Sequence, residues 1–118
     1  MDLEELKERL RQIDISNIKI TKHAHDRIQD KRRKINYNQI ISLILTQKEL
    51  YKFEEQIPKN SETEQKFKLW FKLNYLYDMN VYIVMNKIIQ EKALNRLEII
   101  SAHKVKRNIQ QHIGKNEN

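Results

Sequence analysis

Apolar side chains recur with a helical period over the first 45 residues of the chain. Their spacing predicts helices over residues 3–12, 22–33 and 37–45, each preceded by a residue that favours the N-cap position. The third helix has the clearest pattern, because its apolar residues lie at i, i+3, i+4, i+7 and i+8. The expected N-caps are Asp2, Thr21 and Asn36, and the apolar residues of the third helix are Tyr37, Ile40, Ile41, Ile44 and Leu45.

Beyond Thr46 the apolar residues recur with a period of two, which is typical of strands. Residues 51–57 predict one strand, 58–65 a polar loop, and 66–75 the clearest strand of the sequence. The two faces of this last strand differ, because one is apolar and the other is mostly basic. The apolar face holds Phe67, Leu69, Phe71, Leu73 and Tyr75, and the other face holds Lys66, Lys68, Trp70, Lys72 and Asn74.

Further strands are expected towards the C-terminus. The Asp-Met-Asn sequence at 78–80 predicts a turn, and residues 81–89 predict a central strand because they are apolar on both faces. Residues 97–102 predict a fourth strand after a loop. Residues 15–20 are either a link or a short strand.

This element order predicts an α+β fold of one domain, residues 1–113. Helices come first and consecutive strands follow at short intervals, which favours a four-stranded, mainly antiparallel sheet with the N-terminal helices packed on one face. The apolar face of 66–75 should pack against the third helix. A short helix over 103–113 and a frayed tail at 114–118 complete the expected structure.

Composition excludes several classes of protein. The chain has 118 residues without a cysteine, which rules out a disulfide scaffold, a cysteine nucleophile and a thiolate metal site. It has no apolar run long enough to cross a membrane, and its first residues do not resemble a secretory signal, so we expect a cytoplasmic protein. Lys and Arg number 23 against 16 Asp and Glu, and the net charge of +7 suits an acidic partner such as nucleic acid.

The predicted second helix carries the first candidate cluster. His23 and Arg27 are four residues apart and share a helix face, with Lys31 one turn further. A titratable ring beside a guanidinium suits phosphate binding and proton transfer. The alternative is a solvated basic helix. A metal site at His23 and His25 is disfavoured, because their rings diverge on a helix. Arg32 and Arg33 add to the basic charge of this segment.

A second candidate cluster is the basic face of the clearest strand. Lys68, Trp70 and Lys72 interleave cations with an aromatic ring, a pattern that suits single-stranded nucleic acid, since lysines follow phosphates and the ring stacks on a base. The alternative is an ordinary exposed sheet face with protective lysines.

The third candidate cluster lies where the last strand ends. His103, Lys104 and Arg107, with Lys106 between them, bring polar groups to the margin of the core. They would converge with His23 and Arg27 if the last strand ran beneath the second helix. The alternative is a basic terminal helix with a capping residue.

Two segments resemble known families. Residues 97–112 (LEIISAHKVKRNIQQH) are similar to the end of BrnT-type toxins, where a strand closes with an R-I-I-S-A-R-K run and leads into a charged helix. Residues 20–36 (ITKHAHDRIQDKRRKIN) resemble a small-toxin-like family with a His-Ala-x-x-Arg pattern, a second Arg and then Ile. The matching residues in the second pattern are His23, Ala24, Arg27, Arg33 and Ile35.

Both families belong to the RelE-like set of small basic endoribonucleases. The spacing from Arg27 to Arg33 is two residues longer than in the pattern, and His103 stands where the BrnT-like run has an arginine, which makes His103 a candidate general acid or base. The resemblance implies the toxin of a type II toxin–antitoxin system that cleaves mRNA, free or on the ribosome, by 2′-OH attack. It implies no metal or cofactor, and a partner antitoxin through which the protein oligomerises.

The resemblance also assigns roles to residues. His23 and His103 would transfer protons, Arg27, Lys104 and Arg107 would stabilise the phosphate, and Trp70 would stack on a base. A non-catalytic nucleic-acid-binding module and a mobile-element accessory protein remain the alternatives. The remaining cations expected to bind nucleic acid are Lys31, Arg32, Arg33, Lys68, Lys72 and Lys106.

Overall fold

The computed structural model describes residues 1–30, 35–88 and 95–107 and has an α+β fold. Its helices come first along the chain and its longer strands follow, as the sequence predicts. The helices are α1 (Leu3–Arg11), α2 (Lys22–Ile28) and α3 (Tyr37–Thr46), and the strands are β1 (Ile18–Ile20), β2 (Leu50–Gln56), β3 (Glu64–Lys72), β4 (Tyr77–Asn86) and β5 (Leu97–Lys106).

The strands form one mixed sheet in the order β1-β5-β4-β3-β2. Strands β2 to β5 pair as antiparallel neighbours, and β1 adds a fifth strand that runs parallel to β5, with Ile18 opposite Leu97. The four-stranded prediction is therefore corrected to five, and 15–20 proves to be a short 3₁₀ turn followed by a strand. β4 occupies the centre of the sheet, as its apolar composition predicts.

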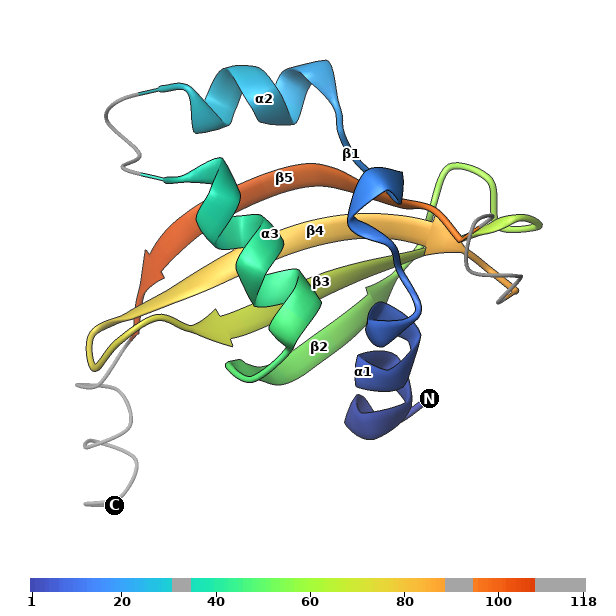
Figure 1. Cartoon of the computed structure of the whole chain (residues 1–118), viewed down its shortest axis with the longest axis horizontal. Coiled ribbons are helices and arrows are strands. Elements are labelled where there is room, and N and C mark those ends of the chain that lie inside the picture. The colour runs from blue at the N-terminus through green and yellow to red at the C-terminus, as the bar shows by residue number, and fades with distance from the viewer. Residues whose placement is uncertain (31–34, 89–94, 108–118) are drawn as a thin grey trace.

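Two helices cover one face of the sheet. Helix α3 crosses that face, α1 lies beside it near β2, and α2 runs along β5 (Figure 1). Phe67, Leu69 and Phe71 of β3 are fully buried in the same apolar cluster as the inward side of α3. The predicted packing of the apolar strand face on the third helix is confirmed for these residues. The α3 side of the cluster consists of Ile40, Ile41 and Ile44, with Leu43 and Leu45 partly buried against it.

The helix N-termini are the ones that the sequence predicts. The side chain of Asp2 accepts a hydrogen bond from the Glu5 N–H, and that of Thr21 accepts one from Ala24. Asn36 accepts from the N–H of Asn38. Such caps satisfy backbone donors that have no partner inside the helix. Helix α2 ends at Ile28, earlier than expected, and residues 31–34 lie outside the described part of the chain.

The predicted turn at 78–80 is wrong. Strand β3 ends at Lys72, and the chain reverses around Asn74, whose side-chain oxygen accepts hydrogen bonds from the N–H groups of Leu76 and Tyr77. Asparagine favours turns through such bonds, and here it overrides the apparent alternation. Tyr75 therefore lies in the turn and is 74% exposed instead of joining the core.

The predicted helix at the C-terminus is wrong in its first turn. Residues 103–106 continue β5, because their backbone pairs with β4 as far as Tyr77 opposite Lys106. The remainder of the expected helix, from 108 to 113, lies outside the described residues, as does the 114–118 tail.

Candidate functional site

Strand register gathers the candidate residues on the face of the sheet that α1 and α3 leave uncovered, called here the open face. Side chains alternate between the two faces of a strand, so the buried Phe71 and Met79 define the helix side. Lys52, Trp70, Asn80 and His103 form one row across four strands of the open face, each directly opposite the next.

An aromatic ring and an imidazole stack beside this row. The ring of Tyr82 lies 5.7 Å from that of His103, centroid to centroid, with 29° between the planes. The two residues are diagonal neighbours on paired strands, since Tyr82 lies opposite Ser101, and such neighbours are within reach of aromatic side chains. Because Tyr82 belongs to the central strand, it holds the His103 imidazole against the middle of the open face.

Lysine ammonium groups lie over the aromatic rings of the open face. The Nζ of Lys68 is 4.6 Å from the centroid of Trp70 and 5.5 Å from that of Tyr82. The Nζ of Lys52 lies 4.6 Å from Trp70 on the β2 side. These distances are within the range of cation–π attraction. The face therefore presents cations against two aromatic rings, one of which, Tyr82, stacks on the histidine.

Asn80 lies at the centre of this arrangement, with Trp70 on one side and His103 on the other. Its side chain is nearly inaccessible, with 4% of the residue exposed, and its Oδ1 has no hydrogen-bond partner. An unpaired buried amide oxygen costs about 1–3 kcal/mol. The position is therefore an energetically unfavourable one for asparagine unless the oxygen acquires a donor.

One end of the open face is held by a buried carboxylate. Asp78 is 5% exposed, and its Oδ1 lies 2.7 Å from Nη2 of Arg107. Its other oxygen accepts a hydrogen bond from the Tyr51 hydroxyl, which a bulge in β2 brings to this face. Burial, together with this bond to Asp78, raises the pKa of Tyr51 to about 12. Arg107 also donates to the Asn74 carbonyl, so its guanidinium is tied to the end of the sheet.

Lys104 does not share the open face with His103, which corrects the expected convergence of His103, Lys104 and Arg107. On a helix these residues would lie near one another, but consecutive residues of a strand point to opposite faces. Lys104 lies opposite the buried Met79, and its Nζ is 5.1 Å from the ring of Tyr77 on the helix side. Lys106, two residues further along β5 and opposite Tyr77, lies on the same side as Lys104.

Helix α2 brings His23 and Arg27 to the margin of β5. The Thr21 N–H donates to the carbonyl of Ile99, 3.1 Å away, and the helix then packs along the strand that carries His103. Both candidate side chains are exposed, while the helix buries Ala24 and Ile28. The expected cations at 31–33 lie outside the described residues.

The open face continues beyond Tyr82 into a hollow. Its apolar lining consists of Val84 and Ile100 of the sheet and of Ile57 and Pro58 of the β2–β3 loop. Lys66 lies directly opposite Val84, and Glu98 lies opposite Val84 on the other side. The hollow thus extends the surface beside the histidine and offers apolar contacts between opposite charges.

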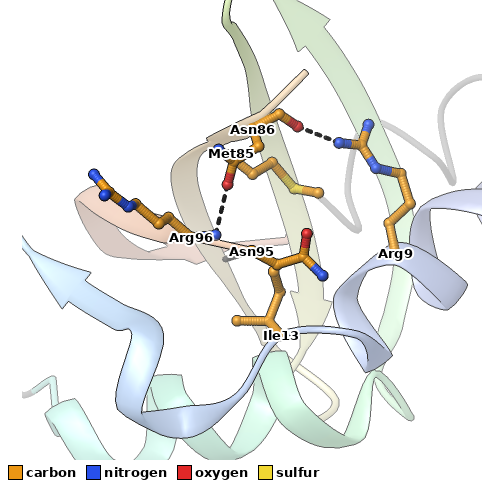
Figure 2. Close-up of a pocket in the computed structure, with 6 residues that line it drawn as sticks. All are labelled: Arg9, Ile13, Met85, Asn86, Asn95 and Arg96. Carbon is orange, nitrogen blue, oxygen red and sulfur yellow. Dashed lines mark hydrogen bonds between the residues drawn. The ribbon is translucent and has the colours of Figure 1, made fainter. Parts of the chain in front are cut away.

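A different hollow, on the helix side, is lined by residues whose hydrogen bonds connect α1 to the sheet. The buried guanidinium of Arg9 donates to the side chain of Gln65. It also donates to the backbone carbonyl of Asn86, a bond drawn in Figure 2, and the two bonds attach α1 to the end of the sheet. The Oδ1 of Asn86 in turn accepts from the backbone N–H of Arg96, 2.6 Å away. Burial lowers the pKa of Arg9, and Glu55 partly offsets this. The Nε of Arg9 stays buried without a hydrogen-bond partner, while its two terminal nitrogens are both bonded.

Sequence reasoning missed Asn80 and Tyr82 as site residues. Asn80 was assigned to a turn, and Tyr82 to the interior of a strand apolar on both faces. Once 77–86 is taken as one strand, alternation places both on the same side as Lys68 and Trp70. The period-two alternation of this segment could have indicated the face of both residues, but the turn wrongly predicted at 78–80 divided the strand.

The described residues contain neither a metal-ligand cluster nor a membrane-spanning helix. Over 1–30, 35–88 and 95–107, no group of three or more His, Asp or Glu side chains is placed to hold a metal ion. None of the helices in these ranges is long and apolar enough to cross a membrane. Comparison with protein-family models, curated proteins and solved structures found no match to this chain.

Proposed function

We propose that the open face binds single-stranded RNA and cleaves it without a metal ion. The observation that carries this proposal is the row of Trp70, Asn80 and His103 across three strands, with Tyr82 stacked on the histidine. A stacking ring, a titratable imidazole and a lysine then lie on one accessible surface.

The rings and lysines support RNA binding. A nucleobase stacks on Trp70 or Tyr82, and base–aromatic stacking contributes about 1–3 kcal/mol per base. Lys52 and Lys68, whose ammonium groups already lie at the rings, take the adjacent phosphates. Lys72, exposed on the same strand, extends the path of positive charge.

The histidine supports cleavage. A 2′-OH attacks the adjacent phosphate, so a base must remove its proton and an acid must protonate the departing 5′-oxygen. His103 serves as the base, and Lys68 stabilises the charge that gathers on the phosphate. His23 and Arg27, on the helix that packs along β5, are the candidates for the second proton-transfer group and a further cation. Arg107 acts less directly, since Asp78 already holds it.

The biological role that this chemistry and the resemblance support is that of a toxin in a type II toxin–antitoxin system. The substrate is mRNA in the cytoplasm, free or on the ribosome. An antitoxin covers the basic open face and keeps the protein inactive until released. No cofactor is needed for the reaction proposed here.

One observation favours a second candidate function, a binding module without catalysis. The Lys52–Trp70–Lys68 group alone provides a cation-flanked stacking surface, and it needs no histidine. Trp70→Leu should weaken binding about 5–150-fold under either proposal. His103→Gln should abolish cleavage while leaving binding intact only if the protein is a nuclease.

Incubation of the protein with single-stranded RNA in EDTA tests the proposal. Cleavage is expected for the parent and should fall about 10²–10⁴-fold in His103→Gln. Lys104→Gln is the matched control, because it alters the next residue of the same strand on the opposite face. Equal loss in both variants, or no cleavage by the parent on free RNA or ribosome-bound mRNA, refutes the nuclease proposal.

A further inference from the structure

We infer that Asn80 is a positioning residue for His103, and that its side-chain oxygen accepts a hydrogen bond from the imidazole when the imidazole gains a proton. This inference rests on the proposed function for its catalytic meaning, but it stands on the geometry of the two side chains. Asn80 and His103 are direct cross-strand partners on the open face. Such partners have Cβ atoms about 4.5–5.5 Å apart, which is within reach of an amide and an imidazole.

The unpaired oxygen of Asn80 is compatible with a neutral histidine whose bare nitrogen faces it. A neutral imidazole has one N–H donor and one bare nitrogen, and the bare nitrogen cannot bond an amide oxygen. The Oδ1 of Asn80 is buried and has no partner in the structure. Protonation turns both ring nitrogens into donors, so the nitrogen that faces Asn80 can donate to Oδ1 in the charged ring, whichever nitrogen carries the proton in the neutral one.

Such a bond favours the imidazolium over the neutral ring. Stacking on Tyr82 already limits the rotation of the His103 ring, so the acceptor acts on a ring whose plane is held. In a reaction where His103 removes a proton from the 2′-OH, the bond strengthens as the proton arrives. Asn80 would thus stabilise the transition state relative to the resting enzyme, which is the condition for a rate effect.

Other groups also bear on the charge of His103. The ammonium group of Lys68 lies over the ring of Tyr82, on which His103 stacks. Helix α2 carries further charged or titratable side chains near β5, and the other such side chains belong to the strands of the sheet. On β1, α2, β4 and β5 these groups are Lys19, Lys22, His23, His25, Asp26, Arg27, Tyr77, Asp78, Tyr82, Glu98, Lys104 and Lys106, and Arg107 follows directly after β5.

The experiment is an NMR titration of the histidine rings, with the His103 signals assigned by their loss in His103→Gln. Asn80→Leu removes the acceptor and keeps a similar shape, and Asn80→Asp replaces the amide with a carboxylate. The proton affinity of His103 should fall about tenfold in Asn80→Leu and rise above that of the parent in Asn80→Asp. Because the Leu variant also removes an unpaired buried oxygen, it should fold at least as stably as the parent.

Two results overturn the inference. One is a His103 titration that is the same in Asn80→Leu as in the parent. The other is a change confined to the indole N–H signal of Trp70, which would make Trp70 the donor to Asn80. The titration does not depend on catalysis. A parent that fails to cleave RNA but shows the expected shifts refutes the proposed function alone, and cleavage without the shifts refutes the role of Asn80 alone.

For an active parent, the pH–rate profile provides a second readout. The limb that reports His103 should move by about 1 pH unit towards lower pH in Asn80→Leu. A purely structural role for Asn80 would instead lower the rate equally at every pH, and that outcome also overturns the inference.

Discussion

Truncation of Phe71 to alanine should remove a large part of the stability of this protein. Phe71 is fully buried on β3, where it lies between Leu50 of β2 and Met79 of β4. Loss of such a ring costs about 3–5 kcal/mol, because the apolar transfer energy is lost and a cavity remains. Domains of this size are stable by only about 5–15 kcal/mol, so the loss is a third of the total or more in most of that range.

Urea unfolding followed by circular dichroism measures this effect. With a slope of about 1.5 kcal/mol per molar urea, the midpoint should fall by about 2–3 M. Tyr75→Ala is the matched control, since Tyr75 continues the same odd-numbered series but lies exposed in the turn after β3. Its stability should differ from the parent by about 0.5 kcal/mol or less.

The comparison of the two variants decides whether β3 ends at Lys72. Equal destabilisation by both substitutions would mean that Tyr75 belongs to the core and that the strand continues as its alternation suggests. An unchanged midpoint for Phe71→Ala would mean that the assignment of faces is reversed, and with it the location of the open face.

Three further predictions concern charge and titration. Binding of single-stranded RNA should weaken with salt at a log–log slope of about −3 if about four phosphates are neutralised, and Lys68→Gln should reduce the steepness by about 0.7; binding that ignores salt would contradict the RNA proposal. The pKa of Tyr51, about 12, lies above the usual value of 10, so its contribution to stability is complete below pH 10 and declines as pH rises towards 12. Ultraviolet titration should accordingly lose its highest tyrosine step in Tyr51→Phe, and an unaltered curve would show that another tyrosine titrates last. Arg9→Ala should cost about 1–3 kcal/mol and speed hydrogen exchange in α1, because it leaves the polar groups that it bonds unpaired, whereas the exposed Arg11→Ala should change stability by about 0.5 kcal/mol or less.

Local signals in the sequence predicted the elements whose structure is locally determined. Helix α3 combines an N-cap at Asn36 with an apolar stripe, and both features act within a few residues of the chain. The alternation of apolar and polar residues from Phe67 to Phe71 likewise depends only on β3 having one buried face and one open face. These parts were predictable because their own residues decide them.

The errors arose where distant pairing or a single turn residue decides the structure. Residues 103–106 have helical spacing in the sequence, yet their hydrogen bonds to β4 make them a strand. Asn74 reverses the chain through two side-chain bonds that no periodicity reveals. The site depends on both, since register with β4 brings His103 beside Asn80. Its histidine and lysines could be named from the sequence, but their grouping on one face could not.

The position of β5 in the sheet has a consequence for the order of folding. This strand comes last among the described elements, yet it lies between β4 and β1, which is separated from it by most of the chain. Strands β2, β3 and β4 can pair as soon as they are synthesised, whereas β1 has no partner until β5 arrives. Pairing over such a distance is slow compared with the closing of local hairpins. A chain still emerging from the ribosome therefore has the rings and lysines of the open face before it has the histidine, and the surface becomes complete only after the last strand docks.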